Sequence, residues 1–349
     1  MKNMKKVLAM LLCAAMVCGS MTACGSKEEV PAETPKTEAA ESDKAAQTEE
    51  EGSVELTFVA ASAAHGLGNT LDPALDQNAC VNLYIGVCDT LLAVDEITNE
   101  ILYILATSCE PVDDTTWEVT IRDGVEFTNG KPLTAEACKK ALEYELASNV
   151  RISTMADIAS MEADGQVLTI KTNSMVPIMP KILSEVNLVI FDVDGTEDYA
   201  EGVIGTGPYI LETKDAEGNM TLVKNENYWQ GEPGADKIHI KNITDKSALT
   251  MGMQSGELDW SEIQTSDLAL FEGDDNYEII SYEMYRDYFL FINPEYNFTD
   301  DDALREAITY AVDREAYVQG IYSGHATPST TLYPSITPYY SADVKQPDY

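Results

Sequence analysis

Residues 115–148 read TTWEVTIRDGVEFTNGKPLTAEACKKALEYELAS, and this stretch decides the class of fold. Its first part alternates apolar and polar residues as a strand does, and an Asp-Gly turn leads to a second, short strand. An Asn-Gly turn follows, and the rest predicts a helix capped by Thr134, with Glu136 and Glu143 early in it. A hairpin joined directly to a helix indicates a protein that mixes both kinds of element.

Helices and hairpins alternate in the same way on both sides of this stretch. Upstream, the patterns predict a strand at 54–59, a loop of small residues at 60–70 and, after Leu71-Asp72-Pro73, a helix near 77–94. Downstream, turn residues separate two strands within 161–171 and again within 207–224. We therefore expect an α/β or α+β fold.

A boundary between two parts of the chain is predicted near residue 289. The aromatic strand YFLFIN, which ends at Asn293, gives way to an acidic loop at 294–302 and then to a helix at 303–317. We interpret this change as a hinge. The unit that begins there has about sixty residues, barely enough for an independent domain. We therefore expect the chain to be a fragment of a longer protein.

The charge of the chain excludes one large class of function. Sixty acidic and 22 basic side chains among 349 residues give a formal net charge of −38, whereas nucleic-acid binding requires a basic face. Hydrophobic residues make up 44% and charged residues 23%, which is typical of globular proteins. The length favours two domains.

The N-terminus is predicted to direct export. A basic segment, MKNMKK, precedes an apolar run at 7–17 that is too short to span a bilayer. Met21-Thr22-Ala23-Cys24 resembles the bacterial lipobox, which implies a signal peptide at 1–23 and a diacylglyceryl group on Cys24. The alternative is an ordinary signal peptide that is cleaved elsewhere. Residues 24–52 are acidic and have no aromatic side chain, so they predict a solvated tether.

Several motifs, in the same order over nearly the whole exported part, resemble the extracellular solute-binding proteins of family 5, the dipeptide-, oligopeptide- and nickel-binding receptors of ABC importers. The segments that carry the resemblance are LDP (71–73), VCDTL (87–91), WEVTIRDGVEFTNGKPLTAE (117–136), GTGPYIL (205–211), KNENYW (224–229), SGELDW (255–260) and DDALREAITYAVDREAYVQGIYSG (301–324). The resemblance implies a type II periplasmic-binding-protein architecture, with two lobes that close on a ligand and a second lobe that is incomplete here.

The resemblance also implies a division of the chain into domains. A first-lobe core would comprise 53–94 and 204–288, with 95–203 as an inserted subdomain and 289–349 as the start of the second lobe. Family members hold the ligand's amino group with a second-lobe carboxylate, and several hold its carboxylate with a basic residue there. Neither anchor can be assigned in this sequence.

The nickel-binding branch of the family is matched only in part. An arginine of that branch corresponds to Arg151, but Thr154 stands where a tryptophan is expected and Val81 replaces a pocket methionine. The segment SEVNLVIF (184–191) has no counterpart to a further pocket arginine. These departures favour short peptides over metal chelates.

Five residues are predicted to contact the ligand. His65 lies in the glycine-containing loop after the first strand, where the resemblance places the cleft. The guanidinium of Arg151 suits a ligand carboxylate, the alternative being a surface salt bridge. Arg286, with Tyr285 and Tyr288, combines a polar anchor with aromatic rings, the alternative being packing between lobes.

The remaining chemistry-bearing residues are expected to be structural. His239 predicts a solvent-facing strand position, and His325 a turn. The sequence 192–198, DVDGTED, resembles a shortened calcium loop that lacks the distal glutamate, so we expect no metal there. No nucleophile or zinc-protease motif occurs. We also assign Trp117, Trp229 and Trp260 to the core.

The cysteines of the exported part, Cys80, Cys88, Cys109 and Cys138, are expected to be small core hydrophobes rather than metal ligands, because no C-x-x-C pair occurs. A disulfide formed after export stays open.

The sequence as a whole predicts a binding protein. We expect a monomeric lipoprotein on the outer face of the cell membrane that captures short peptides for an ABC permease and its ATPase subunits. It would use no cofactor and perform no chemistry. A nickel or other metal-chelate receptor is the alternative within the family, and a surface-anchored hydrolase or a sensor or adhesin are the alternatives outside it.

Overall fold

A computed structural model describes residues 53–59, 70–75, 78–95, 98–281, 286–295, 300–329, 331–337, 340–341 and 343. This part of the chain forms two compact units. Unit 1 comprises the described residues up to Asp245 together with Gly252–Ser261, and unit 2 comprises Lys246–Met251 and the described residues from Glu262 onward. The lobe boundaries expected from the sequence stay a prediction. Cys24, His65 and Tyr285 lie outside the described residues.

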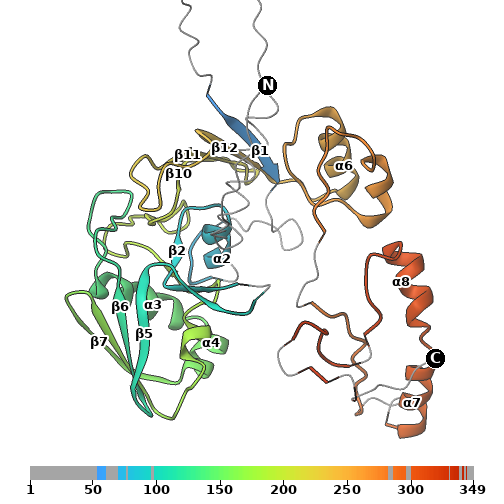
Figure 1. Ribbon diagram of the computed structural model, residues 1–349, viewed down its shortest axis with the longest axis horizontal. Helices are drawn as coiled ribbons and strands as arrows, with labels where there is room; N and C mark the ends of the chain where they lie inside the picture. Colours follow the sequence, from blue (N-terminus) through green and yellow to red (C-terminus); the bar gives the residue numbers. More distant parts are fainter. Residues whose placement is uncertain are drawn as a thin grey trace, which may run out of the picture. The chain divides into compact units, whose positions relative to one another are not determined.

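One end of unit 1 is a four-stranded sheet in the order β1-β12-β11-β10 (Figure 1). Its strands are β1 (Glu55–Val59), β10 (Tyr209–Lys214), β11 (Met220–Lys224) and β12 (Lys237–Lys241). β1 runs parallel to β12, with Leu56 opposite Ile238, while β11 is antiparallel to both of its neighbours. The predicted hairpin at 207–224 is confirmed, and Gly218 adopts a φ of 84° in its turn.

The other end of unit 1 is an antiparallel sheet in the order β5-β6-β8-β7, with α2 and β2 between the two sheets (Figure 1). The elements here are α2 (Asn78–Tyr84), β2 (Asp89–Thr90), β3 (Leu92–Val94), β4 (Ile101–Tyr103), β5 (Ala106–Asp113), β6 (Thr116–Ile121), α3 (Ala135–Leu146), α4 (Val150–Ala156), β7 (Ile158–Asp164), β8 (Val167–Thr172), α5 (Met179–Ile182) and β9 (Val189–Ile190). β2 pairs with β9, and β3 pairs with β4.

The stretch at 115–148 folds largely as expected. The Thr134 hydroxyl accepts a hydrogen bond from the Ala137 amide at 3.2 Å and so caps α3. The predicted short strand is reduced to one bridge, between Glu126 and Pro132, across the Asn-Gly turn. One bridged residue pair is shorter than an ordinary strand, so no ladder forms at this turn.

The helix expected near 77–94 is too long by ten residues at its C-terminal end, because α2 ends at Tyr84. Gly86 then adopts a φ of 78°, which a glycine reaches without steric cost and which breaks a helix. Residues 89–90 and 92–94 become β2 and β3 instead. The pairing of β2 with β9 and of β3 with β4 therefore overrides the local helical pattern.

A continuous core fills unit 1. Leu56, Val119 and Ile170 are fully buried and come from both sheets. Cys88, Cys109 and Cys138 are buried, Cys80 is half-buried, and none of the four forms a disulfide with another described cysteine. Burial raises the pKa of the Cys109 thiol to about 12, helped by the charge of Glu110. The prediction of small core hydrophobes is confirmed for the three buried cysteines.

Unit 2 contains η1 (Thr265–Leu270), α7 (Asp302–Tyr310), α8 (Arg314–Tyr322) and the first part of α6 (Lys246–Ser255). The single helix expected at 303–317 is two helices, because Asp313 caps a new one by accepting from the Ala316 amide at 2.9 Å. The strand expected to end at Asn293 forms no ladder with any described residue. None of the helices in the described ranges combines the length and apolarity that a bilayer crossing requires.

Candidate functional site

The carboxyl end of β1 has the topology of a ligand site. Trp260 forms a parallel bridge to Phe58, on the side of β1 opposite to β12. Two hydrogen bonds reinforce this pairing, since the Asp259 amide donates to the Thr57 carbonyl and the Asp259 carboxylate accepts from the Thr57 amide, each at 2.8 Å. β1 is therefore the middle of three parallel segments.

Chain order makes β1 a topological switch point. From β12 the chain passes through α6 and returns to the opposite side of β1 at residues 258–260. In open α/β sheets, ligands bind outside the carboxyl ends of the strands where the strand order reverses. Residues 60–69, which include the predicted contact His65, follow Val59 in the sequence and lie outside the described residues.

Aromatic side chains stand at this edge. The rings of Phe58 and Trp260 lie edge to face, with centroids 6.4 Å apart. Trp260 is 43% exposed, so its assignment to the core is wrong, whereas Trp117 is buried as expected. Trp260 is itself bridged to Phe58, and the exposure of its side chain depends on neighbours that are distant in sequence.

Arg151 lies on α4 and makes a two-pronged contact with Glu185. Its Nη2 is 3.1 Å from Glu185 Oε2, and its Nη1 is 3.5 Å from Oε1. The Arg151 side chain is 58% exposed, so the pair is solvated on the outer side. The fork is of the kind that binds carboxylates, and in this structure an internal carboxylate occupies it.

Two of the other predicted ligand contacts, Arg286 and Tyr288, are in unit 2 and exposed. The Tyr288 ring lies 6.1 Å from that of Tyr322, tilted by 38°. Of the three predicted contacts that the structure describes, Arg151 belongs to unit 1, and Arg286 and Tyr288 belong to unit 2.

The remaining histidines behave as structural residues. His239 projects from β12, with Nε2 3.3 Å from Glu55 Oε2 and Nδ1 3.5 Å from Thr221 Oγ1. His325 follows the end of α8, and its amide donates to the Tyr322 carbonyl. The strand position expected for His239 and the turn expected for His325 are confirmed, but the His239 side chain is only partly exposed rather than fully solvent-facing.

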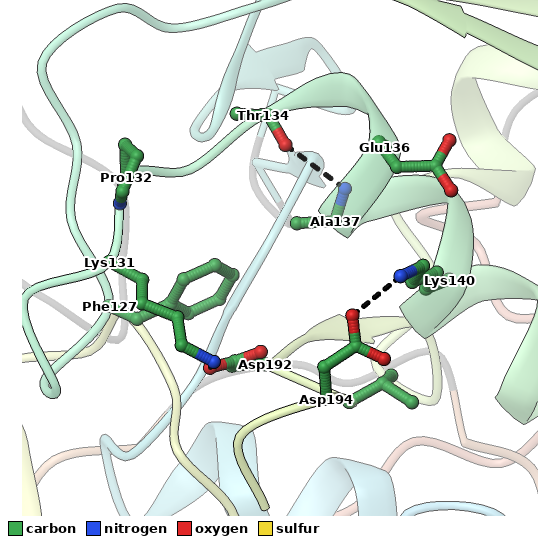
Figure 2. A pocket seen from close by; sticks show the side chains of 10 residues that line it. Phe127, Lys131, Pro132, Thr134, Glu136, Ala137, Lys140, Asp192 and Asp194 are labelled. Atoms are coloured by element: carbon green, nitrogen blue, oxygen red, sulfur yellow. Dashed lines mark hydrogen bonds and ion pairs between the residues drawn. The ribbon is translucent and has the colours of Figure 1, made fainter.

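A pocket of about 220 Å³ lies at the N-terminus of α3 (Figure 2). Figure 2 shows Lys131 directed at Asp192 and Lys140 at Asp194, at nitrogen to oxygen distances of 2.7 and 2.5 Å. The lining residues are Phe127, Lys131, Pro132, Thr134, Glu136, Ala137, Lys140, Asp192, Val193 and Asp194. Both lysines are already paired with carboxylates.

The calcium-like loop is held by the protein's own donors. Asp192 accepts from Lys131, from the Asn129 amide at 2.8 Å and from the Gly195 backbone at 3.0 Å. Burial raises the pKa of Asp192, but the Lys131 and Asn129 contacts outweigh it, so the pKa falls below its ordinary value. Among the described residues, no group of three or more His, Cys, Asp or Glu could hold a metal ion.

A buried carboxylate that the sequence patterns did not indicate joins three segments of unit 1. Asp89 Oδ2 accepts from Thr206 at 3.0 Å and from Trp229 Nε1 at 3.2 Å, and Tyr228 lies 3.5 Å from Oδ1. The Arg122 guanidinium covers the Trp229 ring at 4.7 Å. Burial raises the pKa of Asp89, and the three donors partly offset this. The sequence signal that could have predicted this cluster is the presence of polar residues in the motifs VCDTL, GTGPYIL and KNENYW.

Comparisons with known proteins agree with this fold. The model of the family described as bacterial extracellular solute-binding proteins, family 5 Middle, matches residues 100–349. The nickel-binding protein NikA of Staphylococcus aureus is 28% identical over 268 residues, which cover 76% of this chain and 53% of the relative. The glutathione-binding protein GsiB of Salmonella paratyphi A is 29% identical over 289 residues, covering 77% and 55%.

A solved structure of Staphylococcus aureus NikA, in complex with Ni(L-His)₂, superposes with a TM-score of 0.71 at 25% identity. The superposed region covers 82% of this chain and 60% of the NikA chain. The chain therefore spans about half the length of the curated relatives it matches. The predicted family and its mixed α/β fold class are confirmed.

Proposed function

We propose, because the chain belongs to the bacterial extracellular solute-binding proteins of family 5, that it captures a small solute and presents it to an ABC permease driven by ATPase subunits. The observation that carries this proposal is the switch point at β1, where three parallel segments end beside exposed Trp260. Closure of two lobes around the solute would exclude water and favour the ligand-bound state.

The solute that we propose is a short peptide. In support, a relative that matches 77% of this chain is a glutathione-binding protein, and glutathione is a tripeptide. His65, Arg151, Tyr285, Arg286 and Tyr288 are the proposed contacts. Arg151 already holds a carboxylate in a two-pronged contact, so a peptide carboxylate would take the place of Glu185.

A nickel chelate is the second candidate, and the similarity to NikA over 76% of the chain favours it. The described residues contain no group of His, Cys, Asp or Glu that could hold a metal. A nickel ion would therefore arrive with its own donors, for example two histidine molecules, and the protein would recognise the complex.

Isothermal titration of the full chain tests both candidates. Glutathione, dialanine and trialanine form one series, and nickel with free histidine forms the other. The peptide proposal predicts saturable heat from the first series and recovery of the ligand unchanged, as a receptor without catalytic activity requires. Heat from the chelate alone would favour the second candidate.

Variants at the charge pair sharpen the titration. We expect R151A to weaken binding of glutathione, whereas E185A leaves the guanidinium free and strengthens it. K171A serves as a control, because Lys171 on β8 makes a similarly exposed ion pair with Glu162 on β7 of the same unit. Equal affinities of all three variants for glutathione would show that Arg151 does not contact the ligand.

We also propose that Cys24 carries a lipid that anchors a monomeric protein to the outer face of the cell membrane. The basic and apolar N-terminal segments and the Met21–Cys24 tetrad support this proposal. Labelled palmitate should be incorporated into the wild-type protein and not into C24A. A C24A variant that keeps both label and membrane attachment would refute the anchor.

A further inference from the structure

We propose that Trp260 is a specificity-determining contact, which stacks on a planar ring carried by the ligand. This inference rests on the proposed function and names a chemical feature of its solute. The ring could be the side chain of an aromatic peptide residue or the imidazole of a histidine that chelates a metal. Both offer the same flat π face, and titration with each kind of ligand distinguishes them.

The position of Trp260 places it at the expected ligand edge. Its backbone closes the sheet beside Phe58, and its side chain lies at the carboxyl end of the central strand. A large apolar side chain at a strand's end is usually buried by neighbouring segments, yet this indole is 43% exposed. The exposed indole therefore stands at the carboxyl end of β1, which is the edge where ligands bind at the switch point of an open α/β sheet.

The immediate surroundings of the indole leave it free to stack. Phe58 packs edge to face against it at 64°, which fixes one side of the ring system. The neighbouring carboxylate of Asp259 is turned back to the Thr57 amide rather than outward. The ring thus offers a π surface beside β1, at a residue that is bridged to Phe58.

These features favour a ring over an aliphatic group. Aromatic pairs are stabilised beyond the area they bury, and a tryptophan that is already oriented loses little freedom when a ring stacks on it. A ligand without a ring would gain only part of this contact. We therefore expect discrimination by about tenfold between a phenylalanine peptide and its leucine analogue.

Titration of the full chain and its variants tests the proposal. The ligands are Ala-Phe-Ala, Ala-Leu-Ala and nickel with histidine, and the variants are W260L and W260F. Y103L is the matched control, because Tyr103 has nearly the same exposure, 42%, on β4 of the same unit. W260L should weaken binding of the ring-bearing ligand about tenfold, W260F should weaken it less, and Y103L should leave it unchanged.

Acrylamide quenching of the wild-type protein needs no substitution. Trp117 is 8% exposed, Trp229 is half-buried and Trp260 is 43% exposed, so the largest share of the quenching by acrylamide should come from Trp260. A ring-bearing ligand that stacks on Trp260 should reduce it. This measurement keeps the test valid if W260L does not fold.

The outcomes separate the proposed function from the contact at Trp260. A wild-type protein that binds no member of the panel overturns the proposed function and the Trp260 contact with it. Binding that W260L leaves unchanged, with no protection from acrylamide, overturns the contact alone. An equal loss in W260L and Y103L also overturns it, because the effect would then be general. Which ring-bearing ligand responds identifies the source of the ring.

Discussion

Replacing Glu145 with glutamine should make the stability of unit 1 less sensitive to a rise in pH from 5 to 8. The Glu145 side chain lies on α3 and is 1% exposed. Its Oε1 accepts a hydrogen bond from the Val189 amide at 3.0 Å, but Oε2 has no partner in the described part of the chain. Burial raises the pKa of Glu145 well above its ordinary value, and the Val189 contact offsets this only in part.

The sign of the effect follows from this pKa. A carboxyl group whose pKa is higher in the folded state binds its proton more tightly there than in the unfolded chain. The free energy of unfolding therefore falls as pH rises from the unfolded value of 4.5 to the folded pKa. The slope is about 1.4 kcal/mol per pH unit for one proton. E145Q cannot ionise and should lack this slope.

Urea unfolding at pH 5, 6, 7 and 8 measures the difference. Tryptophan fluorescence is a suitable signal, because Trp117, Trp229 and Trp260 all belong to unit 1. An amide N–H left unpaired in E145Q would lower the free energy of unfolding by about 1 to 3 kcal/mol at every pH. The test is therefore how the free energy of unfolding changes with pH, and not its absolute value.

A variant on the same helix provides the control. Glu143 is half exposed beside Lys139, and E143Q removes the same charge from the surface. Its stability relative to wild type should change little with pH. A difference between wild type and E145Q that stays constant from pH 5 to 8 would refute the reasoning about burial.

Three further predictions concern local contacts. G207A should lower the free energy of unfolding of unit 1 by about 1 to 3 kcal/mol, because the added Cβ would clash with the Gly86 carbonyl oxygen. Urea unfolding measures this loss, and an unchanged unfolding midpoint would contradict the prediction. T206V should cost about 1 to 3 kcal/mol in the same assay by removing a donor to buried Asp89, whereas retained stability would make that bond dispensable. D313A should destabilise α8 by about 1 kcal/mol, because the helix loses its N-cap. Amide hydrogen exchange of residues 314–317 should become faster, and unchanged exchange rates would contradict the prediction.

Local patterns predicted the elements whose stability depends on near neighbours in sequence. The α3 helix begins where Thr134 predicted it, and the hairpin of β7 and β8 turns at Asp164-Gly165, where Gly165 has a φ of 59°. Caps and tight turns are specified by a few adjacent residues. The family was identified from sequence motifs that occur in the family's order, and the family model confirms it.

Patterns failed where distant residues compete for the same backbone. Residues after Tyr84 have a helical apolar stripe, yet Asp89 and Thr90 pair with β9, about a hundred residues away in the chain. Arg151 was a candidate for a ligand carboxylate, and only the fold revealed that Glu185 occupies its fork. No local signal could have predicted either partner.

The sequence by itself determined the acidic character, the family and the mixed fold, because these depend on composition and on motifs in order. Only the tertiary structure decided that Trp260 is exposed beside Phe58 and that Glu145 and Asp89 are buried. Exposure and burial are set by contacts between segments that are far apart in the chain, and a linear pattern does not contain them.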